Sequence, residues 1–317
     1  MSPEFYRVVT PIKLGLITGS VSGWIAYVWL LKIMIPVSFL TFLLDYSGVM
    51  HHLDFALIPF MRLIDLPPSA AIPLAAGILT GIYGGIAAMT VLSFSMNQMT
   101  LIAIFLLISH NMIVESVVQG KSGMASLKTV LVRLTASVVT VLAVARCMDV
   151  NAGAALSALA SAPPVQTFWD AVSSWGIATG WLSLKIFIII MALMMVLGLM
   201  KSFNIIYGLV RLLKPVLWLM GIGERVGLMW LTAVIFGVAY GSAVIVEEFR
   251  EGNIAPDQLT KLHISIGINH SMVEDPALFA ALGISLFWLW VPRLITAIVA
   301  VRLFDLWKIV ERTCLKR

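Results

Sequence analysis

Residues 109–115 of this chain read SHNMIVE, and residues 269–275 read NHSMVED. Each stretch has a histidine between small polar residues, a methionine two positions later and an acid five positions later. Further matches occur outward from them in one order: Leu31-Lys32-Ile33 with Leu184-Lys185-Ile186, Pro59 with Pro215, Gly81 and Gly85 with Gly237 and Gly241, and Arg133 with Arg293. Any two membrane helices share apolar residues, but a shared order of Lys, Pro, Gly, His, acid and Arg indicates an internal duplication.

The composition points to a lipid bilayer. The 317 residues are 60% apolar without counting glycine, whereas soluble domains reach about 45–50% with glycine included. Stretches long enough to cross about 30 Å of hydrocarbon lie near residues 16–44, 70–95, 127–148, 177–201, 229–249 and 285–307. The sequence therefore predicts an all-α integral membrane protein with about six transmembrane helices.

A linker divides the chain into two halves. Residues 149–176 contain two adjacent prolines and no lysine or arginine, which is typical of a connecting segment. The first repeat is then residues 1–148, and the second is residues 177–317. The segments 50–66 and 203–222, which contain the repeated proline, mix charged and apolar residues and are expected to be two amphipathic helices lying in the membrane interface.

The His-bearing segments, residues 98–119 and 256–283, decide the topology. If each turns back as a re-entrant helical hairpin, each half crosses the membrane three times and the second half is inverted. Basic residues then lie mostly on the inside, as the positive-inside rule requires, with only Arg62, Arg146, Arg250 and Lys261 outside. The prediction is an inverted repeat in the bacterial cytoplasmic (inner) membrane, multi-pass, with both termini cytoplasmic and the linker external.

Polar residues gather where the two hairpin tips are expected to meet. Such side chains are costly in hydrocarbon and normally face protein or a water-filled cavity. The tip residues predicted to bind a solute are Ser109, His110 and Asn111 in the first half, and Asn269, His270, Ser271 and Glu274 in the second. Tyr83 and Tyr240, within the repeated glycine segments, could add hydroxyls, although such glycines also serve close helix packing. The two histidines are expected to lie close together.

The acids beside the histidines have two interpretations. His270 and Glu274 are four residues apart and would share one face of a continuous helix, so that with His110 they could ligate a metal or pass a proton. Alternatively, the histidines cap the broken helices, while Glu115 pairs with Arg133 and Asp275 with Arg293. Because both acid and arginine positions recur, the sequence predicts these two structural ion pairs.

These motifs resemble those of the nucleoside-recognition, or Gate, domain family. The resemblance covers both halves and rests on Gly81-Ile-Tyr83-Gly84-Gly85 with residues 109–111, and on residues 237–242 with residues 269–275. Related Gate segments are found in ferrous-iron transporter membrane domains, spore maturation membrane proteins and concentrative nucleoside transporters. The iron-transporter branch has cysteines within its Gate helices, whereas Cys147 and Cys314 lie elsewhere. The resemblance implies membrane transport more firmly than any one substrate.

Three functions follow as hypotheses. The first is a transporter that moves a small polar or ionic solute by alternating access, with a proton as one candidate coupling ion; the second is a divalent metal-ion permease; the third is a non-transporting membrane assembly protein. We expect no enzyme, because no HExxH, GxSxG or comparable motif occurs, and no cofactor. Scattered basic residues argue against nucleic acid. The expected partners are the solute and the lipid bilayer, and whether the chain forms a homodimer is left open.

Overall fold

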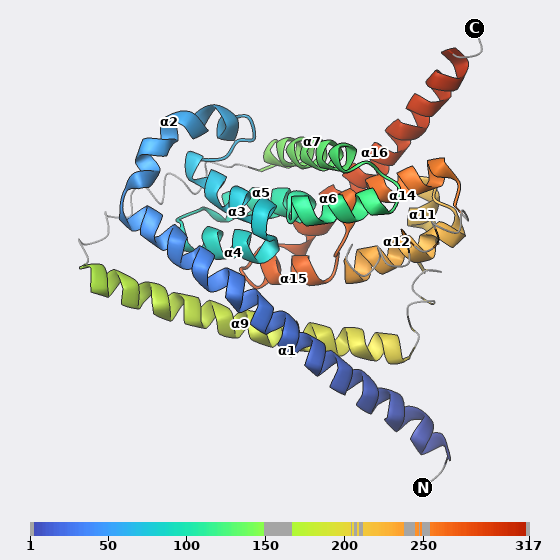
Figure 1. Cartoon of the computed structure of the whole chain (residues 1–317), viewed down its shortest axis with the longest axis horizontal. Helices are drawn as coiled ribbons and strands as arrows, with labels where there is room; N and C mark the ends of the chain where they lie inside the picture. Colours follow the sequence, from blue (N-terminus) through green and yellow to red (C-terminus); the bar gives the residue numbers. More distant parts are fainter. Residues whose placement is uncertain are drawn as a thin grey trace.

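The structure is a computed structural model that describes residues 3–148, 167–203, 205, 208, 212–237, 245–246, 248 and 254–314. The described elements are helical: α1 (Pro3–Tyr46), α2 (Val49–Arg62), the 3-10 turn η1 (Pro68–Ala70), α3 (Ala71–Thr80), α4 (Ile82–Val91), α5 (Met96–Ser109), α6 (Met112–Lys121), α7 (Ser126–Ala145), α9 (Phe168–Ser202), α11 (Lys214–Met220), α12 (Glu224–Phe236), α14 (Pro256–Asn269), α15 (Glu274–Ala280) and α16 (Leu286–Cys314). Figure 1 shows their arrangement.

Several helices have the length and the apolar surface of membrane-spanning helices. Among the described residues, five segments are long and apolar enough to cross a membrane: Thr10–Tyr46, Met96–Lys121, Ser126–Ala145, Phe168–Ser202 and Leu286–Cys314. Apolar side chains on α1 and α9 are exposed on the surface of the chain; Ile25 and Trp181, for example, are each 63% exposed. A water-soluble protein rarely leaves such long apolar surfaces uncovered. The chain is therefore an all-α integral membrane protein, as its composition predicts.

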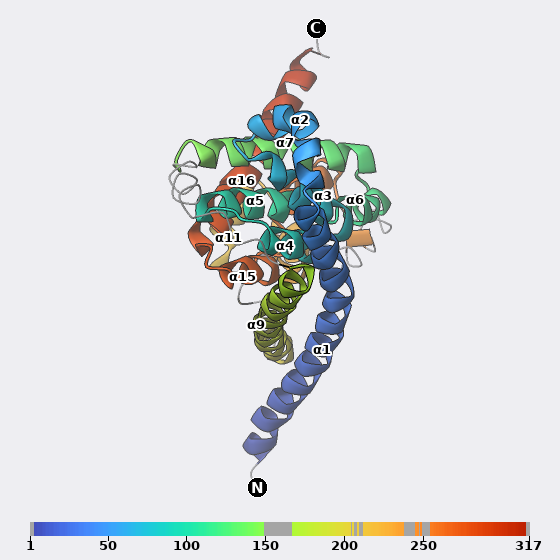
Figure 2. The ribbon, with the colours of Figure 1, turned by 90° about the vertical axis from the view of Figure 1, so that its left-hand side faces the viewer.

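The long helices α1 and α9 run antiparallel and project together from the other helices (Figure 2). Glycines on α1 bring the two backbones into contact: a Cβ added to Gly19 would lie 2.5 Å from the carbonyl oxygen of Met194. At the other end of the pair, Phe42 packs against Phe168. Small residues spaced by four are the usual device for close helix approach in lipid, and the sequence has Gly15, Gly19 and Gly23 at this spacing.

The chain reverses direction at Gly81, between α3 and α4. A Cβ added to Gly85 would lie 3.3 Å from the carbonyl oxygen of Pro73, whereas residues twelve apart in one continuous helix are separated by about 18 Å. The two short helices must therefore lie side by side. Gly81 has a φ of 97° and a ψ of −179°, a conformation that is essentially restricted to glycine. The stretch 70–95, predicted to cross the membrane, is instead a helical hairpin.

The His-bearing stretch is a broken crossing rather than a hairpin. Helices α5 and α6 are separated by only two residues, and α7 packs along both of them. In the second half, α14 and α15 pack along α16 in the same way. Met96–Lys121 forms one apolar span across the first break, so the chain does not reverse there. The hairpins predicted at residues 98–119 and 256–283, with their tips at the histidines, are thus replaced by broken helices, but the first half keeps three long segments and one hairpin.

The remaining predicted segments are only partly described. Helix α2 (Val49–Arg62) occupies the first expected amphipathic segment, and α11 (Lys214–Met220) lies in the second. Helix α12 ends at Gly237, whose φ of 81° corresponds to that of Gly81. Residues 238–244, which follow it, and residues 149–166 of the predicted linker lie outside the described residues.

Candidate functional site

The two helix breaks share one backbone geometry. Asn111 and Ser271 both adopt left-handed conformations, with φ values of 48° and 47°. The amide of Asn111 donates to the carbonyl oxygen of Gly77 at 2.9 Å, and the amide of Ser271 donates to that of Ala233 at 3.3 Å. Non-helical backbone within a membrane needs such partners because no water is available there. Each break is therefore held by the helix that precedes a repeated glycine.

A buried arginine satisfies the carbonyls at each break. Arg133 on α7 donates from Nε to Ile108 O and from Nη2 to His110 O, both at 2.7 Å. Arg293 on α16 donates to Ile268 O at 3.3 Å and to His270 O at 2.8 Å. The last carbonyls of a helix have no partner within the helix, and guanidinium is a strong donor to them. Sequence reasoning placed these arginines beside acids and missed this second task.

The two histidines face each other at the centre of the molecule. Their ring centroids are 5.0 Å apart, and their residues are 6% and 1% exposed, so the predicted proximity is present. Nδ1 of His110 lies 2.8 Å from Leu106 O, and Nδ1 of His270 lies 2.9 Å from Ile266 O. Because a carbonyl only accepts, each Nδ1 carries the proton. Each Nε2 is therefore left to face the space between the rings.

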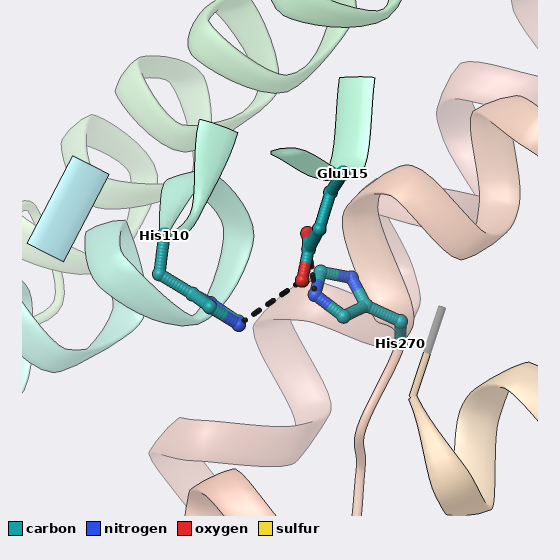
Figure 3. Close-up of side chains that lie close together, drawn as sticks. All are labelled: His110, Glu115 and His270. Carbon is teal, nitrogen blue, oxygen red and sulfur yellow. Dashed lines mark ion pairs between the residues drawn. The ribbon is translucent and has the colours of Figure 1, made fainter. Parts of the chain in front are cut away.

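The acid of each half lies beside the histidine of the other half. Glu115 Oε2 lies 3.2 Å from Nε2 of His270, and Asp275 Oδ2 lies 3.4 Å from Nε2 of His110. Figure 3 shows the carboxylate of Glu115 between the two rings. The predicted ion pair of Glu115 with Arg133 is present at 2.8 Å. Among the described residues the predicted pair of Asp275 with Arg293 is not formed, because the acid turns toward His110 of the other half.

Glu274 points away from the histidines. Tyr83 donates its hydroxyl to Glu274 Oε1 at 2.8 Å. The same carboxylate lines a cavity of about 90 Å³ between α1 and α9, together with Thr18, Ser22 and Lys201. The expectation that His270 and Glu274 share a helix face is wrong, because the helix is interrupted between them. The acid that joins His110 and His270 in a group with metal-ligand geometry is instead Glu115.

The other predicted residues have different surroundings. Ser109 donates its hydroxyl back to Phe105 O at 2.7 Å. Asn269 is buried, and neither polar atom of its side chain has a hydrogen-bond partner among the described residues. The same is true of Gln119 on α6, a residue that no sequence motif singled out. Tyr240 lies outside the described residues.

The site as a whole is a buried set of acceptors with few donors. Two imidazole Nε2 atoms and two carboxylates converge, and within the described part of the chain Arg133 is the guanidinium in direct contact with them. Acceptor atoms at these distances repel one another unless a cation or a proton lies between them. The arrangement can therefore hold a positively charged ion or a solute that presents donor groups.

The chain is similar to known membrane proteins. Residues 27–145 match the Gate family model, which is described as nucleoside recognition. The chain is 27% identical over 291 residues to an uncharacterised membrane protein, YvoD, of Bacillus subtilis (strain 168), and this match covers 90% of the chain and 91% of that protein. No solved structure is significantly similar to the chain.

Proposed function

Residues 27–145 of this membrane protein are a Gate domain, and from that premise we propose that the chain is a transporter. It moves a small polar or ionic solute by alternating access between two inverted halves. The observation that carries the proposal is the buried polar site, to which each half contributes a broken helix, a histidine and an acid. A solute site at the junction of two such halves can be exposed to either side by a change in their packing.

The matching contacts support two related halves. Asn111 and Ser271 share a left-handed conformation, and Arg133 and Arg293 donate to corresponding carbonyls. An accidental resemblance between membrane helices has no reason to reproduce the same hydrogen bonds. We infer that the second half repeats the first.

The helix directions support inversion. Helix α1 is antiparallel to α9, which begins the second half. Helix α7 is antiparallel to α16. The hydroxyl oxygens of Thr140 and Thr296 are 2.8 Å apart, and twelve residues earlier on α7 the ammonium of Lys128 lies 5.8 Å from the ring centre of Phe304, which is eight residues later on α16. Corresponding helices that face each other in opposite directions are what a twofold axis in the membrane plane produces.

The basic residues give the halves a common orientation. The start of α1 and the ends of α6, α9 and α16 lie on the right-hand side of Figure 1. Sequence positions at these ends include Lys13, Lys121, Lys201 and Lys308. Lys261, expected outside, lies on this side too, 2.6 Å from Asp305 of α16. By the positive-inside rule, we assign this side to the cytoplasm, together with both termini, in a bacterial inner membrane.

The competing hypothesis is an assembly protein whose polar residues only hold the fold. In that case every buried polar group should have a hydrogen-bond partner, because an unpaired group lowers the stability and would serve no function. The side chains of Asn269 and Gln119 have no hydrogen-bond partner among the described residues. A solute in transit would provide such partners, which supports transport.

Uptake into liposomes tests the proposal. The full chain would be reconstituted and offered a labelled nucleoside, an amino acid, a carboxylate and a divalent cation. We expect at least one of them to enter faster than into protein-free liposomes, and both His110→Gln and His270→Gln to abolish the difference. The control is His263→Gln, because His263 is equally buried but contacts Ser122 O outside the site. Uptake equal to that of empty liposomes for every solute, or unaltered uptake in both site variants, would favour the assembly function.

A further inference from the structure

We propose that His110, His270 and Glu115 form a binding site for a divalent transition-metal cation. This inference rests on the proposed function, since it names the class of solute that the central site takes. One ligand atom from each of the three residues can be chosen so that all lie within 4.8 Å of one another, and all three side chains are largely buried. The ligands come from both halves, so the cation would join them.

The histidines are already in the form that binds metal. Each donates its Nδ1 proton to a backbone carbonyl one turn earlier, at 2.8 Å from His110 and 2.9 Å from His270. Metal-ligating histidines nearly always make such a bond with the second ring nitrogen, because it fixes the tautomer and the ring orientation. A histidine that only caps a helix break does not need its other nitrogen aimed at a second imidazole.

The facing atoms need a positive charge between them. Nε2 of His270 is 3.2 Å from Glu115 Oε2, and Nε2 of His110 is 3.6 Å from Glu115 Oε1. A cation with bonds of about 2.1 Å separates tetrahedral ligand atoms by about 3.4 Å, which is between these two distances. Asp275, whose Oδ2 is 3.4 Å from His110 Nε2, is placed to supply a fourth ligand.

The charges at the site favour a cation over an anion or a neutral solute. Arg133 contacts Oε2 of Glu115 at 2.8 Å, which leaves Oε1 on the side of His110. Arg293 is bonded to backbone carbonyls; its charge acts on Asp275, but the ion-pair contact that Asp275 makes among the described residues is with His110. A divalent cation between Asp275 and His110 would give this carboxylate a direct cationic contact.

The donor atoms narrow the class of metal. Imidazole nitrogen with carboxylate oxygen suits Mn, Fe, Co, Ni or Zn, whereas Mg²⁺ and Ca²⁺ prefer oxygen ligands alone. Both cysteines, Cys147 and Cys314, are exposed and lie far along the chain from the site, so soft thiolate ligation does not enter. Glu274 is bonded to Tyr83 and is not part of the set.

Metal content of the purified full chain tests the inference without a transport assay. The protein in detergent would be stripped with a chelator, equilibrated with ZnCl₂ or MnCl₂, and analysed by mass spectrometry and titration calorimetry. We expect one ion per chain for the wild type, and an affinity at least about tenfold weaker for His110→Gln, His270→Gln and Glu115→Gln, since even outer-shell changes cost about 10–100-fold. Glu274→Gln and His263→Gln should retain the affinity of the wild type.

A second measurement covers variants that fail to fold. X-ray absorption of the Zn²⁺-loaded wild type should show nitrogen and oxygen ligands with the scattering pattern of two imidazoles. Wild-type protein that binds no more metal than the His110→Gln/His270→Gln double variant, or a spectrum without imidazole, would overturn the inference. If metal does not bind but another solute is transported, the metal site fails while the transporter remains; if metal binds and nothing is transported, the reverse holds.

Discussion

Arg133→Ala should destabilise the protein far more than Arg293→Ala, although the two arginines occupy matching positions. Both are fully buried, and each donates to two backbone carbonyls at a helix break. Two carbonyls left without donors cost about 2–6 kcal/mol together, which is the loss expected for Arg293→Ala. Arg133 also forms the 2.8 Å ion pair with Glu115. A charge stranded in a buried site costs about 3–5 kcal/mol more, so Arg133→Ala should lose about 5–11 kcal/mol in total.

The free energy of unfolding can be measured by titration with a denaturing detergent in mixed micelles. A chelator should be present, so that bound metal does not contribute to stability. The double variant Arg133→Ala/Glu115→Gln removes the stranded charge and should recover about 3 kcal/mol relative to Arg133→Ala. Equal losses for the two arginine variants, together with no recovery in the double variant, would refute the assignment of this ion pair as a structural support.

Three further predictions use other parts of the molecule. A cysteine placed at Ser161 of the linker, on a background without native cysteines, should react with an impermeant reagent added outside intact cells; protection there would contradict the inverted topology. Tyr83→Phe should lower the free energy of unfolding by about 1–3 kcal/mol, because the carboxylate that accepts the tyrosine hydroxyl loses its donor; an unchanged midpoint would show that the bond adds nothing. Gly81→Ala should cost about 1–3 kcal/mol at its φ of 97°, whereas Gly180→Ala, with nothing within 4 Å, should gain about 0.5–1 kcal/mol; equal effects would show that the hairpin tip is not strained.

The location of the hairpin illustrates a limit of sequence reasoning. Both the glycine segment at residues 81–85 and the polar segment at residues 109–111 interrupt an apolar stretch, and interruptions of either kind can end a helix. Whether the chain then reverses depends on what the next helix packs against. Helix α4 packs on α3, while α6 continues along α7. These contacts are between separate helices, so the local sequence around each interruption does not predict them.

The amino-acid sequence by itself determined that this is a helical membrane protein and that its two parts carry the same polar residues in one order. Those conclusions depend on composition and on repetition, which are visible along the chain. Only the tertiary structure decided which acid faces which histidine. The rule that residues four apart share a helix face holds only while the helix is continuous, and the break after His270 cancels it. Glu274 then turns toward Tyr83, and Glu115 crosses from the first half to reach His270, because the approach of two packed halves, and not the spacing within either, sets those distances.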